Sequence, residues 1–398
     1  MSDLEKKPID ELLEQEGDNP LLLELEQFTK KDEEIFYASQ SQLILWRFKR
    51  HKLAVFSLIV LVIMYIIAIV PGFFAPYGKD QRFKKYSYAP PSQIKWFAEG
   101  EGFVGPYIYA LTTELDLQTF ATTYIPNEEE GRYPLGLFVK GTVPYKVLGL
   151  FETNIRLFGL RNQTEDSPPL LLFGSDQIGR DVFSRTCYGA QISLTIGLVG
   201  VVMSFVMGIA LGGLSGYIGG LFDAIILVII DLLQTIPQLP LWMTLAAAVP
   251  REIPVVQRYF MMTVVLSFLG WTGLARVVRG RLLAMREEDY AMAAKGAGAS
   301  NWRIVMHHLI PGFTSHLIVT ITINIPAMIL GEVSLGFLGL GMQKPALSWG
   351  VLLTDAQNIM AIANQPWMMI PAGVVIVTVL LFNFVGDGLR DAADPYVM

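Results

Sequence analysis

The sequence predicts an all-α membrane protein that crosses the bilayer several times, with a small β-rich domain inserted after its first span. Of the 398 residues, 52% are hydrophobic and only 17% are charged, whereas about a quarter of the residues in soluble domains are charged. The apolar residues form long blocks, and a helix needs about 20 of them to cross the hydrocarbon core. The net charge of −6 gives no basic field that would attract nucleic acid. We therefore expect the lipid bilayer, and not nucleic acid, as a partner.

Six apolar runs are long enough to span the membrane, at about 53–74, 192–216, 222–247, 258–279, 313–338 and 367–387. The third run contains Asp231 and Pro237, which predicts a kinked or interrupted helix. Four basic residues between Arg47 and Lys52 precede the first run and place the N-terminus in the cytoplasm by the positive-inside rule. Six spans return the C-terminus to that side. They also place the basic loop 280–312 in the cytoplasm.

The segments between and before the spans define four predicted regions. Residues 1–45 form an acidic cytoplasmic tail, interpreted either as solvated with a short amphipathic helix or as a docking segment for a cytosolic partner. Residues 46–77 carry the first span, and 174–398 carry the other five. The segment 78–173 is polar, rich in Pro, Gly and Tyr, and is expected outside the cell membrane. Four of its runs predict strands separated by turns: YIYALTTELD, YPLGLFVKG, YKVLGLF and PLLLFG.

Motifs that carry catalysis or cofactor binding are missing from the sequence. There is no GxxxxGK[ST] phosphate loop and no HExxH. The four histidines show no metal spacing, and the single cysteine, Cys187, excludes a disulfide within the chain. We therefore expect a conduit or a scaffold that is not an enzyme and that holds no metal or cofactor of its own.

Ionisable residues inside spans are costly and indicate functional positions. Asp231 and Glu332 are the two main cases, and Pro237 and Asn383 join them as candidates for the translocation path or for helix packing. Two interpretations remain open for the two acids. They form structural hydrogen bonds between helices, or they act directly in the path.

The polar stretch DYAMAAKGAGASNWRIVMHHLIPG, residues 289–312, interrupts the apolar pattern. Ala291, Ala294 and Gly298 recur at i, i+3 and i+7, which predicts a helix with a small face onto which another protein could pack closely. The alternative is an ordinary amphipathic loop between two spans. Gly298 is a natural helix stop. Ser300 is placed to cap a second helix over 301–309, and we expect Pro311-Gly312 to end it before the next span.

This stretch resembles the cytoplasmic signature of ABC-importer permeases, E-A-A-x3-G-x9-I-x-L-P. Ala293, Ala294, Gly298 and Pro311 stand at the matching spacing. Three positions depart from it: Met292 replaces the acid, His308 the first Ile, and Ile310 the Leu. Four longer segments, at 174–194, 216–241, 331–353 and 366–395, are similar to segments of oligopeptide and dipeptide permeases in the same order. By this resemblance the chain is identified as a C-type permease of that family.

The resemblance implies the six-helix type I ABC-importer permease fold, in the inner membrane of a prokaryotic cell. It also implies a five-part machine with a second homologous permease, two cytosolic ATPase subunits that bind ATP and Mg, and an extracytoplasmic solute-binding protein. Peptides are the implied cargo, with oligosaccharides as the alternative. A membrane-anchored ligand-binding scaffold or sensor is the alternative from another class. Within the core, the resemblance implies cytoplasmic coupling helices over 289–310. The implied ATPase-coupling residues are Tyr290, Met292, Ala293, Ala294, Gly298, Ala299, His308 and Pro311.

Overall fold

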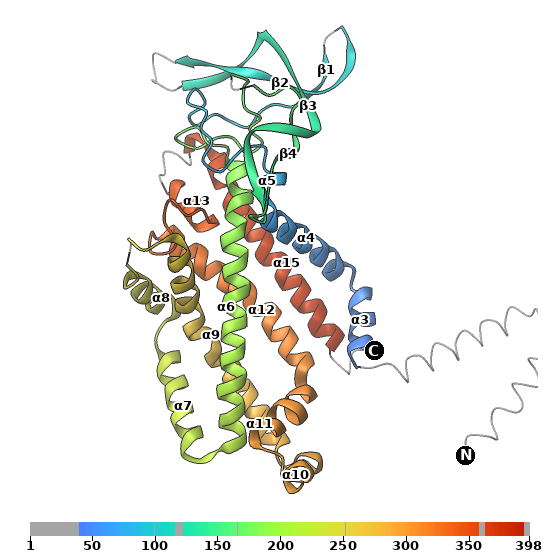
Figure 1. Cartoon of the computed structure of the whole chain (residues 1–398), viewed down its shortest axis with the longest axis vertical. Helices are drawn as coiled ribbons and strands as arrows, with labels where there is room; N and C mark the ends of the chain where they lie inside the picture. Colours follow the sequence, from blue (N-terminus) through green and yellow to red (C-terminus); the bar gives the residue numbers. More distant parts are fainter. Residues whose placement is uncertain are drawn as a thin grey trace, which may run out of the picture.

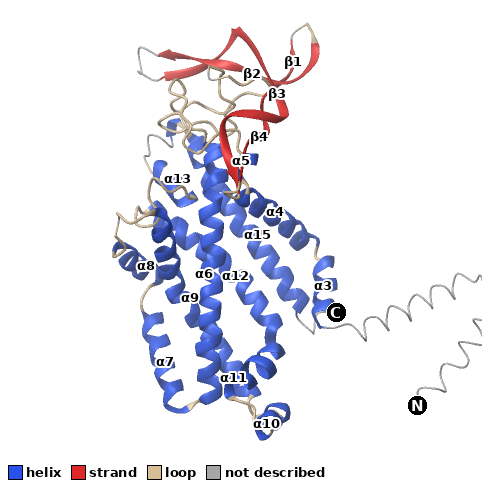
Figure 2. Ribbon diagram, viewed as in Figure 1, coloured by secondary structure: helices blue, strands red, loops and turns tan. Residues whose placement is uncertain are grey.

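The structure is a computed structural model that describes residues 40–98, 100–115, 122–164, 166–250, 252–357 and 363–393. Most of the predicted acidic tail, 1–45, lies outside these residues. A long helical bundle carries a small sheet at one end and a short helical loop at the other (Figures 1 and 2). Within the described residues, five helices are long and apolar enough to cross a membrane, or six if one bent pair counts as a single span. This agrees with the predicted polytopic fold.

The bundle is built from five long helices. They are α4 (Lys52–Ile69), α6 (Val182–Ile218), α9 (Val255–Met285), α12 (Thr314–Phe337) and α15 (Ile370–Ala393). Shorter helices extend or join them: α3 (Gln40–Arg50), α5 (Pro71–Phe74), α13 (Trp349–Asp355) and η3 (Pro366–Met369). The ends of the first and last spans are neighbours, because His51 Nε2 lies 4.0 Å from Asp391 Oδ2.

The apolar run 222–247 is broken, as its prolines predicted. It forms α7 (Gly220–Thr235) and α8 (Gln238–Ala247), which are bent by 91° relative to each other. Pro237 is the N-cap of α8 and has extended backbone angles, so it stands at the break. Figure 1 shows α6 and α9 running from the sheet end to the opposite end, with α7 and α8 returning the chain between them.

The axis of the bundle is a close contact between α6 and α9 that depends on glycine. A Cβ placed on Gly212 would lie 2.3 Å from the carbonyl oxygen of Ala275, and one on Gly216 would lie 2.6 Å from that of Arg279. Gly208, one turn earlier, faces Leu274 at 2.9 Å. Only glycine lets the two backbones approach this closely, which is the usual role of small residues between membrane helices.

The inserted segment forms a four-stranded antiparallel sheet in the order β1-β2-β3-β4. Its strands are Lys95–Ala98, Gly102–Leu115, Thr122–Val147 and Phe151–Leu160. YIYALTTELD lies in β2 apart from its last residue, Asp116, which falls outside the described residues, and YPLGLFVKG lies in β3. YKVLGLF instead ends β3, makes the turn and begins β4.

The prediction of a strand at PLLLFG was wrong. Leu170 is buried against Ile108 and Leu160 beneath the sheet, in a loop. Its backbone N–H donates to the hydroxyl of Tyr77 at 2.6 Å, and the N–H of Leu171 donates to Ser92 Oγ at 2.9 Å. Side-chain oxygens thus take the place of a neighbouring strand, so an apolar run alone did not distinguish a strand from a buried loop.

One arginine fastens the sheet to the end of the first span. Arg156 on β4 is 1% exposed. Its Nη1 donates to the carbonyl oxygens of Gly72 at 2.7 Å and Ala75 at 2.9 Å, and its Nη2 donates to that of Val143 at 2.8 Å. The β3–β4 hairpin therefore reaches down to α5, as Figure 1 shows.

Replacing Arg156 with Met should loosen the sheet from the bundle. Three charge-assisted hydrogen bonds are lost and three carbonyls lose a partner, which we expect to lower the free energy of local opening by about 3 kcal/mol. Hydrogen exchange of residues 72–160 measures this. Lys140→Met, an exposed change on β3, should leave exchange as in the wild type, and equal protection in both variants would contradict the role of Arg156.

Candidate functional site

The candidate coupling loop, residues 286–313, forms the end of the bundle opposite the sheet (Figure 2). It contains α10 (Asp289–Gly296), α11 (Asn301–Arg303), the π-helical segment η1 (Ile304–Leu309) and the 3₁₀ segment η2 (Ile310–Phe313). Asp289 lies in the first turn of α10 and Lys295 in the last, the arrangement that the helix dipole favours.

The turn within the loop follows the local signals of the sequence. α10 ends at Gly296, and Gly298 adopts a left-handed φ of +84°, which a residue with a side chain adopts at a cost. Ser300 then caps α11, since its Oγ accepts a hydrogen bond from the backbone N–H of Arg303 at 3.4 Å. The structure thus confirms both Gly298 as the stop and Ser300 as the cap.

The second helix does not end at Pro311-Gly312, so that prediction was wrong. The chain continues from η1 through η2 into α12, and Asn301–Phe337 forms one long apolar helical segment. Pro311 lies at the start of η2, where a missing backbone N–H removes no internal hydrogen bond. The proline therefore marks a change of helix type and not an end.

Ala291 and Ala294 of the predicted small face turn toward the bundle, while Gly298 is exposed, so this face is not offered as a whole to another protein. Ala291 is 2% exposed. It belongs to a cluster, here called the inner-end cluster, that joins the loop to α6, α9 and α12: Ile209, Leu274, Val278, Leu282, Ala291, Ile304, Val305, Leu309, Phe313 and Leu317. The apolar side chains of η1 leave room only for a small residue on α10, which is why an alanine packs there.

The outer face of the loop carries six of the eight sequence-predicted coupling residues. Tyr290 and Met292 are 44% and 56% exposed, beside Trp302 at 50%. Ala293, Gly298, His308 and Pro311 are also exposed, while Ala294 and Ala299 are half-buried against the inner-end cluster. Partial burial raises the pKa of Tyr290, and the carboxylate of Glu288 raises it further. The tyrosine is therefore a neutral hydroxyl at physiological pH.

Asp231 of the path-candidate set lies on an open face of the bundle. Its Oδ1 accepts from Arg276 Nη2 at 2.5 Å, with the two side chains 64% and 48% exposed in the single chain. About two turns earlier on α7, Asp223 accepts from Arg279 at 2.5 and 2.6 Å. Neither pairing could be predicted from the sequence, because the partners lie 45 and 56 residues apart.

Glu332, by contrast, is buried at 2% exposure and accepts from Ser193 Oγ of α6 at 2.7 Å. The same hydroxyl accepts from the backbone N–H of Trp349 at 3.0 Å, so three elements meet there. Asn383 is exposed on α15, and Pro237 stands at the break between α7 and α8. The structure therefore does not gather the four path candidates into one site.

The sequence analysis did not predict a cluster of ion pairs at the sheet end of the bundle. Asp176 Oδ2 accepts from Arg180 at 2.7 Å and from Arg185 at 2.6 Å. Asp355 adds contacts of 3.4 Å to Arg185 and 2.6 Å to Lys344. Asp176 and Arg180 lie in GSDQIGRD, just before a span, so their charges are visible in the sequence. Asp355 comes from a distant part of the chain, and only the tertiary fold brings it to the cluster.

Five or six spans and a structured polar loop at one end of the bundle define a polytopic membrane protein. A family model described as "Binding-protein-dependent transport system inner membrane component" matches residues 208–398. A second, "N-terminal TM domain of oligopeptide transport permease C", matches residues 39–91. The sheet lies in the stretch between the two matches.

Two curated relatives and a solved structure are similar to more than half of the chain. The oligopeptide transport system permease protein OppC of Bacillus subtilis is 36% identical over 233 residues, which cover 58% of this chain and 74% of that protein. The dipeptide transport system permease protein DppC of the same organism is 39% identical over 225 residues, covering 56% and 68%. An inward-facing MetNI methionine ABC transporter structure aligns with a TM-score of 0.39 at 21% identity, covering 51% of this chain and 94% of that one.

The chain belongs to the family of binding-protein-dependent transport system inner membrane components. Its members are permease subunits of ABC transporters and not enzymes, and the ATPase activity resides in separate subunits.

Ala291→Leu should overpack the inner-end cluster. Because Ala291 is buried against apolar side chains of η1, we expect the free energy of unfolding of the purified permease to fall by about 2 kcal/mol. Ala293→Leu, two residues away on the exposed face, should change it by less than about 0.5 kcal/mol. Thermal unfolding in detergent compares the two. Equal stability of both variants would show that the alanine face is not packed inward.

Proposed function

We propose that this chain is the membrane-spanning permease subunit of an ATP-driven importer that translocates peptides delivered by a binding protein. The observation that carries the proposal is the match to oligopeptide and dipeptide transport permeases over 56–58% of the chain. The matched region includes most of the bundle and the whole candidate coupling loop.

The packing of the loop supports a role in coupling. Ala291, Ile304 and Leu309 share the inner-end cluster with Leu274 of α9 and Leu317 of α12. A densely packed interior transmits displacement instead of absorbing it. A partner that moves the outer face, formed by Tyr290, Met292 and Gly298, therefore moves the attached helices as a body. ATPase subunits seated on this face would drive the switch in this way.

The proposal sets the orientation in the membrane. The loop that meets the ATPases faces the cytoplasm, and the sheet at the opposite end of the bundle lies outside (Figure 1). α3 carries Arg47, Lys49 and Arg50 in its last turn, as expected for a cytoplasmic flank. Both termini, and the tail 1–45, then belong to the cytoplasm, while 78–173 forms the extracytoplasmic insertion between 46–77 and the core 174–398.

A second, homologous permease subunit completes the path in this proposal. The Asp231–Arg276 pair lies on an open face of a membrane helix in the single chain. Lipid contact with two charges at this depth is costly, so such residues face a protein or a water-filled cavity. A second permease subunit packed against this face, as a heterodimer, would provide such a protein surface or enclose such a cavity.

Gly298→Trp should uncouple ATP hydrolysis from transport. The left-handed φ of Gly298 costs a side chain about 1 kcal/mol, and open space surrounds its Cβ position, so the indole projects toward the docked ATPase. We expect ATP-driven peptide uptake in proteoliposomes to fall about tenfold, the effect of about 1.4 kcal/mol lost at a docking surface.

Gly149→Trp is the matched control, because Gly149 has a φ of +73° and open space at the sheet end. It carries the same backbone strain far from the loop. Its uptake should equal that of the wild type, with both variants present in the membrane at wild-type amounts. Normal uptake by Gly298→Trp would show that the loop does not couple.

The outer edge of the sheet offers a surface for the binding protein. Trp96, Phe97 and Phe103 are 50%, 69% and 67% exposed on β1 and β2. The rings of Trp96 and Phe103 stack with centroids 6.4 Å apart. Exposed, clustered aromatic side chains are typical anchors of protein interfaces, and this edge lies at the far end of the molecule from the candidate coupling loop (Figure 1).

The double variant Trp96→Ser, Phe103→Ser should weaken docking of the cargo-loaded binding protein. We expect its Kd for the complete transporter to rise about tenfold or more, as for loss of interface anchors. Ile125→Ser, an exposed apolar change near the other end of the sheet, should leave the Kd unchanged. An unchanged Kd in the double variant would remove the aromatic edge from the proposed interface.

A further inference from the structure

Arg258 is a buried cation without an anionic partner. It lies in the first turn of α9 and is 6% exposed. Its Nη2 donates to the carbonyl oxygen of Pro250 at 2.6 Å, and its buried Nε has no hydrogen-bond partner. Across the part of the chain that the structure describes, no carboxylate lies within 4.0 Å of its guanidinium, although the other intramembrane arginines on α9 are each paired with one.

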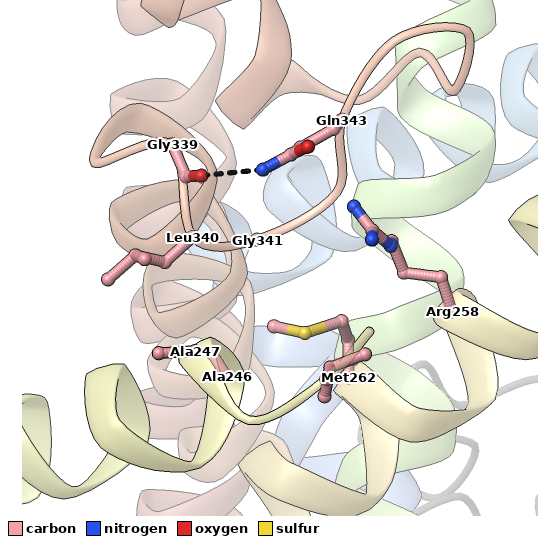
Figure 3. Close-up of a pocket in the computed structure, with 9 residues that line it drawn as sticks. Ala246, Ala247, Arg258, Met262, Gly339, Leu340, Gly341 and Gln343 are labelled. Carbon is pink, nitrogen blue, oxygen red and sulfur yellow. Dashed lines mark hydrogen bonds between the residues drawn. The ribbon is translucent and has the colours of Figure 1, made fainter. Parts of the chain in front are cut away.

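The guanidinium borders a small cavity. Figure 3 shows it directed toward the loop Gly339–Gln343, across from the end of α8 at Ala246. The cavity measures about 50 Å³. This is room for a carboxylate group or a few waters, and too little for a peptide side chain together with its backbone. Gln343 is held in place, since its Nε2 donates to the carbonyl oxygen of Gly339 at 2.8 Å.

Because Arg258 is buried, its positive charge calls for a compensating anion. A guanidinium taken out of water is costly unless a charged partner and further hydrogen bonds compensate it. Its fork of donors matches the two oxygens of a carboxylate. One donor is occupied by Pro250, Nε has no partner, and the side chain lines the cavity, so the geometry is that of a site whose anion arrives from outside the chain.

We propose that Arg258 binds the C-terminal carboxylate of the peptide during its passage. This inference rests on the proposed function and names the chemical group that the permease recognises. Every linear peptide carries this group whatever its sequence, so one arginine serves many cargoes. The broken α7–α8 helix and the loop after α12 border the site on the sheet side of the bundle, where cargo enters an importer.

The test uses the complete transporter with its binding protein in proteoliposomes, and one peptide in two forms, the free acid and the C-terminal amide. Each form is supplied at a concentration that saturates the binding protein. The quantity measured is the ratio of ATP-driven uptake of acid to amide. We expect this ratio to fall about tenfold in Arg258→Gln, the effect of one hydrogen bond to a charged group, and to recover in part in Arg258→Lys.

Arg82→Gln is the matched control, because it removes an exposed positive charge on the sheet side, and its ratio should equal that of the wild type. Preference of the binding protein for the acid form enters every variant equally and cancels in the comparison. If Arg258→Gln lowers uptake of both forms by the same factor, the carboxylate comes from the second permease or the arginine is structural, and the proposal is wrong. If the wild type imports no peptide, the proposed function fails and takes this inference with it.

Discussion

The contact between the backbones of α6 and α9 is the constraint on which the rest of the structure depends. Gly208, Gly212 and Gly216 let the two helices approach until a Cβ would overlap Ala275 and Arg279. This approach brings Arg279 within reach of Asp223 and aligns Ile209 with Leu274 and Val278 in the inner-end cluster. The other end of α6 carries Arg185 and Ser193, which bond to Asp176 and Glu332. One helix thus connects the two ends of the molecule, and a larger residue in the glycine stripe would disturb both.

Some elements of the bundle are tightly packed and others are exposed, a division that suits a protein that switches between two conformations. The candidate coupling loop is packed into the bundle through Ala291 and η1, so its outer face cannot move alone. The bent pair α7 and α8 has few buried residues and exposes its Asp231–Arg276 pair. In the importer we propose, the packed elements are the lever, and the open elements are the surfaces that a second permease and the cargo complete.

The buried polar residues differ in how completely the chain itself provides their hydrogen-bond partners. Glu332 has Ser193, and Asp223 has Arg279 and Ser215. Arg156 donates to three carbonyls and so fixes the sheet, while its buried Nε, like Oε1 of Glu332, has no hydrogen-bond partner. Arg258 has one carbonyl and an open cavity. A buried polar group without partners is costly, and Arg258, which borders the cavity, is the group for which we propose that a ligand supplies the missing partner.

The sequence alone determined what depends on short stretches of chain. The length of the apolar runs predicted the spans, and Pro237 predicted the break. Gly298 with Ser300 predicted the turn of the candidate coupling loop, because backbone φ preferences and capping act over a few residues. Only the tertiary structure decided which side of α10 faces inward, since the spacing of Ala291 and Ala294 suits a buried face and a docking face equally. It also turned PLLLFG into a buried loop and paired Asp231 with Arg276. These outcomes depend on groups that lie far apart in sequence, and no local pattern carries information about which of them will meet.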